Sequence, residues 1–241
     1  MVGRRRRAVW SGAGLGPGSA AAALALVAGS AAAQPLQWQG QLALASELTD
    51  RGISVYPRRP TLQADGQVAR GHWSLAAAAS TDLAGRGEHR VLARLSHYRS
   101  LSDDWQLDAG IGWYGYPGER WARAYDRAEA GIGLGFRDIV SLNLTAIDYR
   151  AWPGRRAGLQ WALEAGLRWP LGAAWSATAS LGQADLPPQP DRRYRYGGIG
   201  LAWQQGDWRL ELNRLGADSA ARYAMGDAGR ARWSALVLKS F

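Results

Sequence analysis

The chain has 241 residues, of which 29 are basic and 20 acidic, giving a formal net charge of +9. It has no cysteine, which excludes disulfides and Cys-based metal sites, and its three histidines argue against a His-based metal site. The aromatic residues are 13 Trp and 9 Tyr against only 2 Phe. Such amphipathic rings suit the headgroup level of a membrane, and a soluble protein with a Trp-rich sugar site is the alternative.

The first 33 residues have the three parts of a secretory signal peptide. Arg4–Arg7 form a basic start, residues 20–28 are apolar, and small residues follow up to Ala33, where we expect cleavage. The apolar run is shorter than the roughly 20 residues of a membrane-spanning helix, although an uncleaved anchor is the alternative. Residues 34–241 then form one domain with 25 basic and 20 acidic residues, a net charge of +5. A secreted protein of this modest charge is expected to have no nucleic-acid partner.

Beyond residue 33, the chain consists of short segments of alternating polarity, each near the 9–11 residues of a tilted membrane strand. In the segment 105–113, for example, Trp105, Ile111 and Trp113 share one face, and Gln106 and Asp108 share the other. The expected strands are 37–48, 61–69, 72–81, 89–98, 105–116, 125–136, 139–148, 158–169, 174–182, 194–203, 207–215 and 231–241.

These strands predict an all-β fold, a single transmembrane antiparallel up-and-down barrel of about twelve strands, with ten to fourteen as the range. Soluble sandwiches and lipocalins show the same alternation, so periodicity alone does not decide. The expected connections alternate between long and short, as in outer-membrane barrels with short periplasmic turns and long outer loops. The long ones include residues 55–60, 186–190 and 216–230. Trp residues at strand ends predict two aromatic girdles: Trp38, Trp73, Trp105, Trp113, Trp169, Trp175, Trp203, Trp208 and Trp233.

The last eleven residues predict a strand that ends on the terminal aromatic Phe241. Chain ends are usually frayed and polar, whereas the last strand of a closed barrel must pair with the first. This ending resembles the C-terminal assembly signal of bacterial outer-membrane barrels. The resemblance implies that the barrel-assembly machinery recognises Phe241.

The first predicted hairpin carries a motif as well. The segment 45–54 contains Ser46 and the run Arg-Gly-Ile-Ser, and the next strand follows a Pro and contains a Gln. This pattern resembles the opening of the TorF family of porins, although Glu47 and Leu48 stand where the family has a Tyr. The resemblance implies an outer-membrane barrel with channel activity, and it leaves the substrate open. The matching residues are Ser46, Arg51, Gly52, Ile53, Ser54, Pro60 and Gln63.

Arg51 has three interpretations in this hairpin. It folds over the lumen and pairs with carboxylates, it contacts outer-leaflet phosphates, or it is a solvated residue of a structural turn. Gly52 permits the positive φ that a turn requires.

Charges of both signs are expected on the inner face of the barrel. They either line a narrow, hydrated pore or pair across the lumen and plug it, because an isolated charge in low dielectric is costly. A twelve-stranded barrel lies between filled eight-stranded and open 16–18-stranded types, so we expect a narrow channel. The candidate pore-lining residues are Glu47, Arg94, Asp108, Arg127, Glu129, Glu164, Arg168, Arg209 and Glu211.

Arginines gather in or beside the long connections, where they suit binding to the phosphates of lipopolysaccharide, with anion recruitment as the alternative. They are Arg58, Arg59, Arg120, Arg123, Arg150, Arg155, Arg156, Arg192, Arg193 and Arg222.

The sequence therefore predicts passive diffusion of small ions or polar solutes across the bacterial outer membrane, with no cofactor and no catalytic residues. Outer-membrane lipids and lipopolysaccharide, the assembly machinery and the solutes are the expected partners. A plugged structural or adhesive barrel is the alternative. A lipid-modifying barrel enzyme is less favoured, because His72, His89 and His97 lack a nucleophile and an acid at suitable positions.

Overall fold

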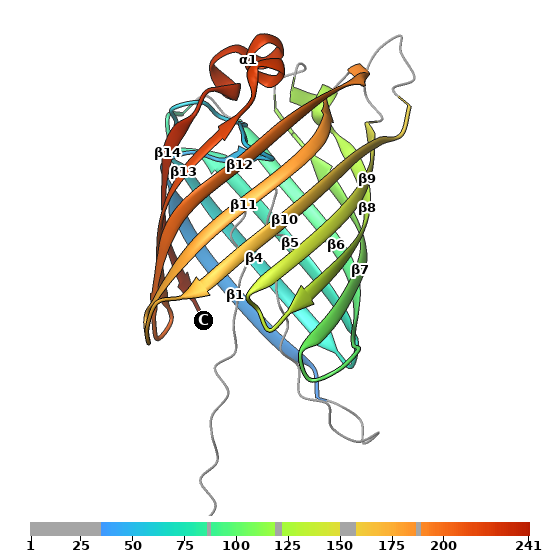
Figure 1. Ribbon diagram of the computed structural model, residues 1–241, viewed down its shortest axis with the longest axis vertical. Helices are drawn as coiled ribbons and strands as arrows, with labels where there is room; N and C mark the ends of the chain where they lie inside the picture. Colours follow the sequence, from blue (N-terminus) through green and yellow to red (C-terminus); the bar gives the residue numbers. More distant parts are fainter. Residues whose placement is uncertain (1–34, 86–87, 119–121, 150–157, 187–188) are drawn as a thin grey trace, which may run out of the picture.

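The computed structural model describes residues 35–85, 88–118, 122–149, 158–186 and 189–241. The expected signal peptide, residues 1–33, lies outside the described residues. Twelve antiparallel strands form one closed barrel in the order β1-β14-β13-β12-β11-β10-β9-β8-β7-β6-β5-β4 (Figure 1). The predicted fold class and strand count are confirmed.

The barrel strands alternate direction along the chain, and neighbours in sequence are neighbours in the wall. They are β1 Gln37–Ala45, β4 Thr61–Arg70, β5 Trp73–Asp82, β6 His89–Ser100, β7 Trp105–Gly115, β8 Arg127–Phe136, β9 Val140–Tyr149, β10 Gln160–Pro170, β11 Trp175–Leu186, β12 Gln189–Gln205, β13 Trp208–Ala217 and β14 Arg232–Ser240.

One end of the barrel carries the short connections, such as 71–72 and 206–207, and we call it the turn end. The other, the loop end, carries the longer connections and the small elements: the hairpin β2 Thr49–Asp50 and β3 Ile53–Ser54, the turns of 3₁₀-helix η1 Ala122–Tyr125 and η2 Gly226–Gly229, and the helix α1 Ser219–Met225. None of the helices in the described part of the chain is long and apolar enough to cross a bilayer.

The chain termini close the barrel. Strand β1 pairs with β14, with Gln41 opposite Ser240. Beyond β14, Phe241 and Gly40 exchange two backbone hydrogen bonds, of 2.9 and 3.0 Å. The Phe241 ring covers the face of Gly40, where a side chain on residue 40 would collide with it. The terminal residue thus extends the seam between the first and last strands, which leaves no open strand edge.

The two faces of the wall have opposite character. Large apolar side chains such as Leu42, Leu75, Ile111 and Leu163 stand exposed on the outside, where they form a continuous apolar band. Exposure of this extent is typical of a surface that contacts lipid. Inward positions carry polar, charged, tyrosine and small residues, because successive residues of a strand point to opposite faces.

The Trp residues expected in girdles lie on the outer face or at the rims, but they are unevenly shared. Trp38, Trp73, Trp105, Trp169, Trp175, Trp203 and Trp208 are all near the turn end, whereas Trp113 and Trp233 are near the loop end.

The connection expected at 183–193 is wrong. Strand β11 continues to Leu186 and β12 begins at Gln189, so the wall is extended there and the alternation of long and short connections breaks. The prolines of this segment favour a loop in the sequence, but paired strand continues on both sides of it.

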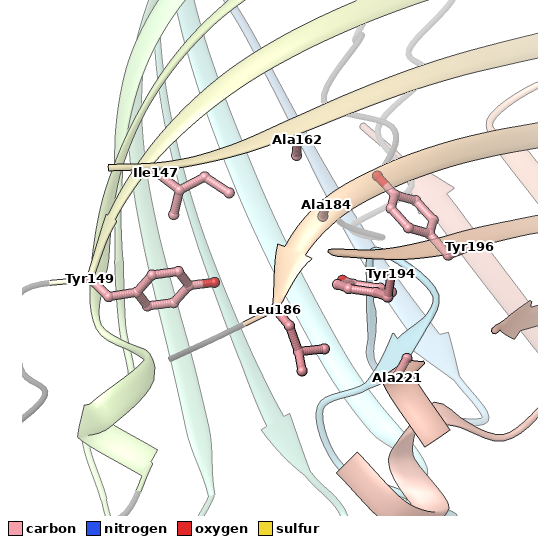
Figure 2. Close-up of a cluster of buried hydrophobic side chains, with 8 residues drawn as sticks. All are labelled: Ile147, Tyr149, Ala162, Ala184, Leu186, Tyr194, Tyr196 and Ala221. Carbon is pink, nitrogen blue, oxygen red and sulfur yellow. The ribbon is translucent and has the colours of Figure 1, made fainter. Parts of the chain in front are cut away.

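A cluster of buried side chains fills the loop end on one side of the barrel (Figure 2). It joins Ile147 and Tyr149 of β9 with Tyr194 and Tyr196 of β12, and Ala221 of α1 is completely buried against it. Asp218 caps α1 by accepting hydrogen bonds from the first backbone amides of the helix, at 3.0 and 3.2 Å. Partly buried Ile53 of β3 packs on the same cluster. The cluster therefore supports the short hairpin from this side of the barrel.

Candidate functional site

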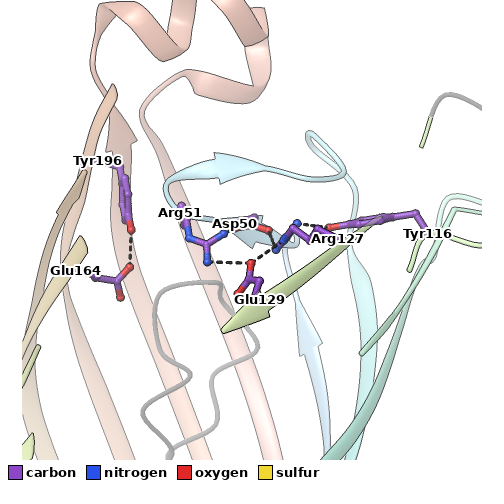
Figure 3. Close-up of polar contacts among 7 residues, drawn as sticks. All are labelled: Asp50, Arg51, Tyr116, Arg127, Glu129, Glu164 and Tyr196. Atoms are coloured by element: carbon purple, nitrogen blue, oxygen red, sulfur yellow. Dashed lines mark hydrogen bonds and ion pairs between the residues drawn. The ribbon is translucent and has the colours of Figure 1, made fainter. Parts of the chain in front are cut away.

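The interior of the barrel is narrowed by the hairpin β2–β3, which leaves the wall after β1 and folds inward at the loop end (Figure 3). The strands pair through Thr49 opposite Ser54 and Asp50 opposite Ile53. The turn between them takes positive φ at Arg51 (48°) and Gly52 (75°). Gly52 lies against Tyr196, where a Cβ would collide with the ring-bearing side chain. Glycine is therefore required at position 52 for two reasons: it adopts a positive φ without strain, and it has no side chain to collide with Tyr196.

Buried ion pairs fix the tip of this hairpin to the wall. Arg51 donates to Glu129 of β8 at 3.0 Å, and Asp50 pairs with Arg127 of the same strand at 2.5 Å. Arg127 also donates to Glu129, at 2.7 Å. Because all these groups are mostly removed from water, losing one partner costs about 3–5 kcal/mol. The pattern of two acids and two bases leaves no net charge at the tip.

The charge of Arg51 is held in place by its neighbours. Burial disfavours the charged guanidinium, but the nearby carboxylates of Glu129 and Asp50 more than offset this and raise the pKa of Arg51 above its ordinary value. Of the three interpretations of Arg51, the structure supports the first: it lies over the lumen and pairs with carboxylates.

A second set of contacts holds the base of the hairpin. Glu47 accepts a hydrogen bond from Ser54 at 2.6 Å and pairs with Arg232 of β14 at 2.9 Å. Arg232 also donates to the carbonyls of Asp227 and Ala228, at 2.5 and 2.6 Å, so it joins the hairpin to η2. Tip and base are thus anchored on different parts of the ring of strands.

Tyrosines surround the ion pairs, and this corrects the expectation that Tyr lies at the headgroup level. Arg127 stacks over the ring of Tyr114 at 4.2 Å and donates to the hydroxyl of Tyr116 at 3.2 Å. A stacked and hydrogen-bonded guanidinium is well suited to a buried position. The tyrosines buried at the loop end are Tyr56, Tyr114, Tyr116, Tyr149, Tyr194 and Tyr196, while the Trp side chains take the outer surface.

Below the hairpin, the lumen contains a cavity of about 50 Å³, measured as the space open to the centres of water molecules. One water needs ~10–15 Å³ on this measure, so the cavity holds a few waters. Its wall includes Arg51 and Glu129 above and the Arg94–Asp108 ion pair, 3.1 Å long, to the side. Glu164 also lines it and accepts a 2.8 Å hydrogen bond from Tyr196 (Figure 3).

All nine candidate pore-lining residues lie at inward positions and are buried or half-buried. Glu47, Arg127 and Glu129 hold the hairpin, and Arg94, Asp108 and Glu164 line the cavity. The other three are nearer the turn end, where Arg209 pairs with Glu211 and Arg168 donates to Ser176 at 3.4 Å. Whether solute passes these side chains stays a prediction.

The motif residues occupy structural positions around the same hairpin. The Ser46 hydroxyl accepts from the backbone of Ala235 at 3.0 Å, and the Pro60 carbonyl accepts from Leu83 at 2.8 Å. Gln63 is buried on β4 and donates to Thr61 at 3.1 Å. Arg51, Gly52, Ile53 and Ser54 belong to the hairpin itself, whereas Ser46 and Pro60 lie where the chain leaves β1 and enters β4.

The arginines expected at the outer loops divide into two groups. Arg58, Arg123, Arg192 and Arg222 are exposed, and Arg193 is exposed although it pairs with Asp185. Arg59 instead turns inward and pairs with Glu88 at 2.6 Å and Asp82 at 3.5 Å, so it is not available for lipid phosphates. Arg120, Arg150, Arg155 and Arg156 lie outside the described residues.

Two of the three histidines, His72 and His97, contact aromatic rings. His97 lies 4.7 Å from the ring of Trp73, and His72 lies 5.4 Å from that of Tyr98, both at the turn end. Among the residues that the structure describes, no group of three or more His, Asp or Glu side chains is arranged to hold a metal ion.

No protein-family model matches the sequence, and no curated protein matches it. The fold is similar to that of solved porins. The KdgM porin has a TM-score of 0.57 at 7% identity over 84% of this chain and 99% of that chain. The structure described as the KdgM porin in complex with disordered oligogalacturonate has a TM-score of 0.57 at 8% identity, with the same coverage. The NanC porin has a TM-score of 0.52 at 9% identity over 85% and 99%. At such identities the likeness establishes the fold: a closed antiparallel barrel of the porin type.

Proposed function

We propose that the protein is an outer-membrane channel for passive diffusion of small ions or small polar solutes. The observation that carries the proposal is the combination of an apolar outer band with a polar lumen, in which a cavity beneath an inward hairpin has room for a few waters. In a barrel of this kind the turn end faces the periplasm and the loop end faces outward. The exposed loop-end arginines then meet the phosphates of the outer leaflet.

The bore of the channel is set by the hairpin rather than by the strand number alone. The ion pairs of Asp50 and Arg51 with β8 cross the upper lumen, and the cavity below them has a volume of about 50 Å³. Hydrated ions are therefore a better match to this lumen than sugars of several rings. Passage of solutes larger than a hydrated ion requires the hairpin to move.

The same hairpin favours a second candidate, a plugged barrel with a structural or adhesive role. A network of fully compensated charges seals a lumen as readily as it narrows one. An open channel and a plugged barrel are both compatible with this geometry, and a conductance measurement distinguishes them.

Membership of the TorF family is part of the proposal. Its support is the motif around Arg51 and Gly52, two residues that form and dock the tip of one inward hairpin. A shared motif with this role predicts that family members carry the same inward hairpin.

The test is electrical recording of the full-length protein, extracted from membranes in detergent and inserted into planar lipid bilayers. Folding is verified beforehand by the faster migration of unheated barrel on denaturing gels. Reproducible current steps support the channel. Silence from folded protein at several voltages overturns it in favour of the plugged barrel.

A further inference from the structure

The charges inside the barrel are mostly compensated within short distances. At the hairpin, Asp50 and Glu129 face Arg51 and Arg127, and Glu47 faces Arg232. Farther down, Asp108 pairs with Arg94 and Glu211 with Arg209. Beside the hairpin, Asp82 and Glu88 share Arg59. Paired groups of this kind contribute little net field to the lumen, since each acid is opposed by an adjacent base.

Two inward carboxyl groups are exceptions. Glu164 of β10 accepts a 2.8 Å hydrogen bond from the hydroxyl of Tyr196. Asp65 of β4 accepts a 2.7 Å hydrogen bond from the amide of Gln41. Both partners are neutral, and within the described residues neither carboxyl forms an ion pair. Glu164 is only 7% exposed, yet it lines the cavity below the hairpin.

The two carboxyl groups lie on opposite walls. Strands β4 and β10 are separated by six steps around the ring in either direction. Each group is the fifth residue of its strand counted from the loop end, Asp65 from Thr61 and Glu164 from Gln160. Both strands run from the loop end to the turn end, so each group lies near the middle of its strand.

We propose that Glu164 and Asp65 make the channel prefer cations, and that they are the residues that determine its ion selectivity. This inference rests on the proposed channel function. A cation between the two walls is attracted by both carboxylates, and an anion is repelled by both. Arg51 shares the cavity with Glu164, but its charge is opposed by Glu129 and Asp50. Arg94, Arg127 and Arg209 do not reverse the preference, because each forms an ion pair with an adjacent acid.

The experiment measures the reversal potential of the full-length protein in planar bilayers under a gradient of dilute KCl at pH 8.5. Dilute salt limits screening, and an alkaline pH favours the ionised form of carboxyl groups whose charge is disfavoured by burial. The variants are Glu164→Gln, Asp65→Asn and the pair together, which keep the shape and the hydrogen-bond acceptors. Asp207→Asn is the matched control, since Asp207 is an exposed acid in a turn outside the lumen.

The wild-type protein is expected to pass K⁺ better than Cl⁻. For a charge roughly 8 Å from the ion in water, each single substitution lowers the permeability ratio about five-fold. The double variant loses the preference, and Asp207→Asn leaves it unchanged. Current steps with an anion preference, or with a ratio that the double variant retains, overturn the inference and leave the channel intact. Absence of current from folded protein overturns the proposed function itself.

Discussion

Replacing Arg51 with Met should release the hairpin β2–β3 from the barrel wall. The substitution keeps the length and apolar stem of the side chain but removes its 3.0 Å hydrogen-bonded ion pair with Glu129. Glu129 retains Arg127 at 2.7 Å, so the cost should lie near the lower end of the range for a broken buried pair, about 3 kcal/mol. At ~1.4 kcal/mol for each factor of ten, the undocked hairpin becomes about 100-fold more populated.

Hydrogen–deuterium exchange read by mass spectrometry measures this opening directly. The amide of Val55, which donates to Leu48 at 2.7 Å where the hairpin closes, should exchange about 100-fold faster in Arg51→Met. Amides in the middle of β7 and β8 should remain protected. Arg137→Met is the control, because Arg137 pairs with Asp104 at the turn end, far along the wall.

The reasoning is refuted if the exchange rate rises by less than about three-fold. A change that small corresponds to about 0.6 kcal/mol, which is the contribution of an exposed ion pair rather than a buried one.

Three further predictions concern the same elements. Gly52→Ala should also speed exchange of the hairpin amides, because a Cβ there meets Tyr196 at a positive φ; exchange as slow as in the wild type would contradict the docked position. Phe241→Ser should reduce the folded, heat-modifiable barrel recovered from membranes several-fold, and an unchanged yield would argue against Phe241 as an assembly signal. Hydrogen bonds from Arg137 lower the pKa of Asp104, so Arg137→Gln should raise the carbon-13 NMR titration midpoint of Asp104 toward ~3.9. The lowered pKa of Asp104 stabilises the folded protein above pH ~4, and this stabilisation is lost as the pH falls through the pKa of Asp104 in the folded state. A titration midpoint that the substitution leaves unchanged would exclude the Arg137–Asp104 pair in solution.

Much of the barrel can be predicted from the sequence because membrane strands obey a strict alternation. In β7, Trp105, Ile111 and Trp113 face outward and Asp108 faces inward, as period two requires. The same rule places Tyr114 on the face of Asp108, so its inward position was available from the pattern. Composition alone suggested that Trp and Tyr side chains contact lipid headgroups. In the structure, the hydroxyl of Tyr116 instead accepts a hydrogen bond from buried Arg127.

The hairpin could not be predicted with the same certainty. Strands β2 and β3 have two residues each, too few to show a period. The partner of Arg51 is Glu129, which is 78 residues away, and their contact depends on closure of the ring. The pairing of lumenal charges was likewise invisible, because an acid and a base on neighbouring strands look the same in sequence whether or not they touch. That no base of the described residues forms an ion pair with Glu164 or Asp65 emerges only in three dimensions.

The central claim is that the lumen conducts and that the hairpin sets its bore. Single-channel conductance of the wild-type protein and of Arg51→Met, recorded side by side in the same bilayer and salt, tests it most directly. Small current steps are expected for the wild type, and larger or longer steps for the variant. Equal conductance in both proteins would show that the hairpin does not determine the diameter of the pore. No conductance from either folded protein would contradict channel function altogether.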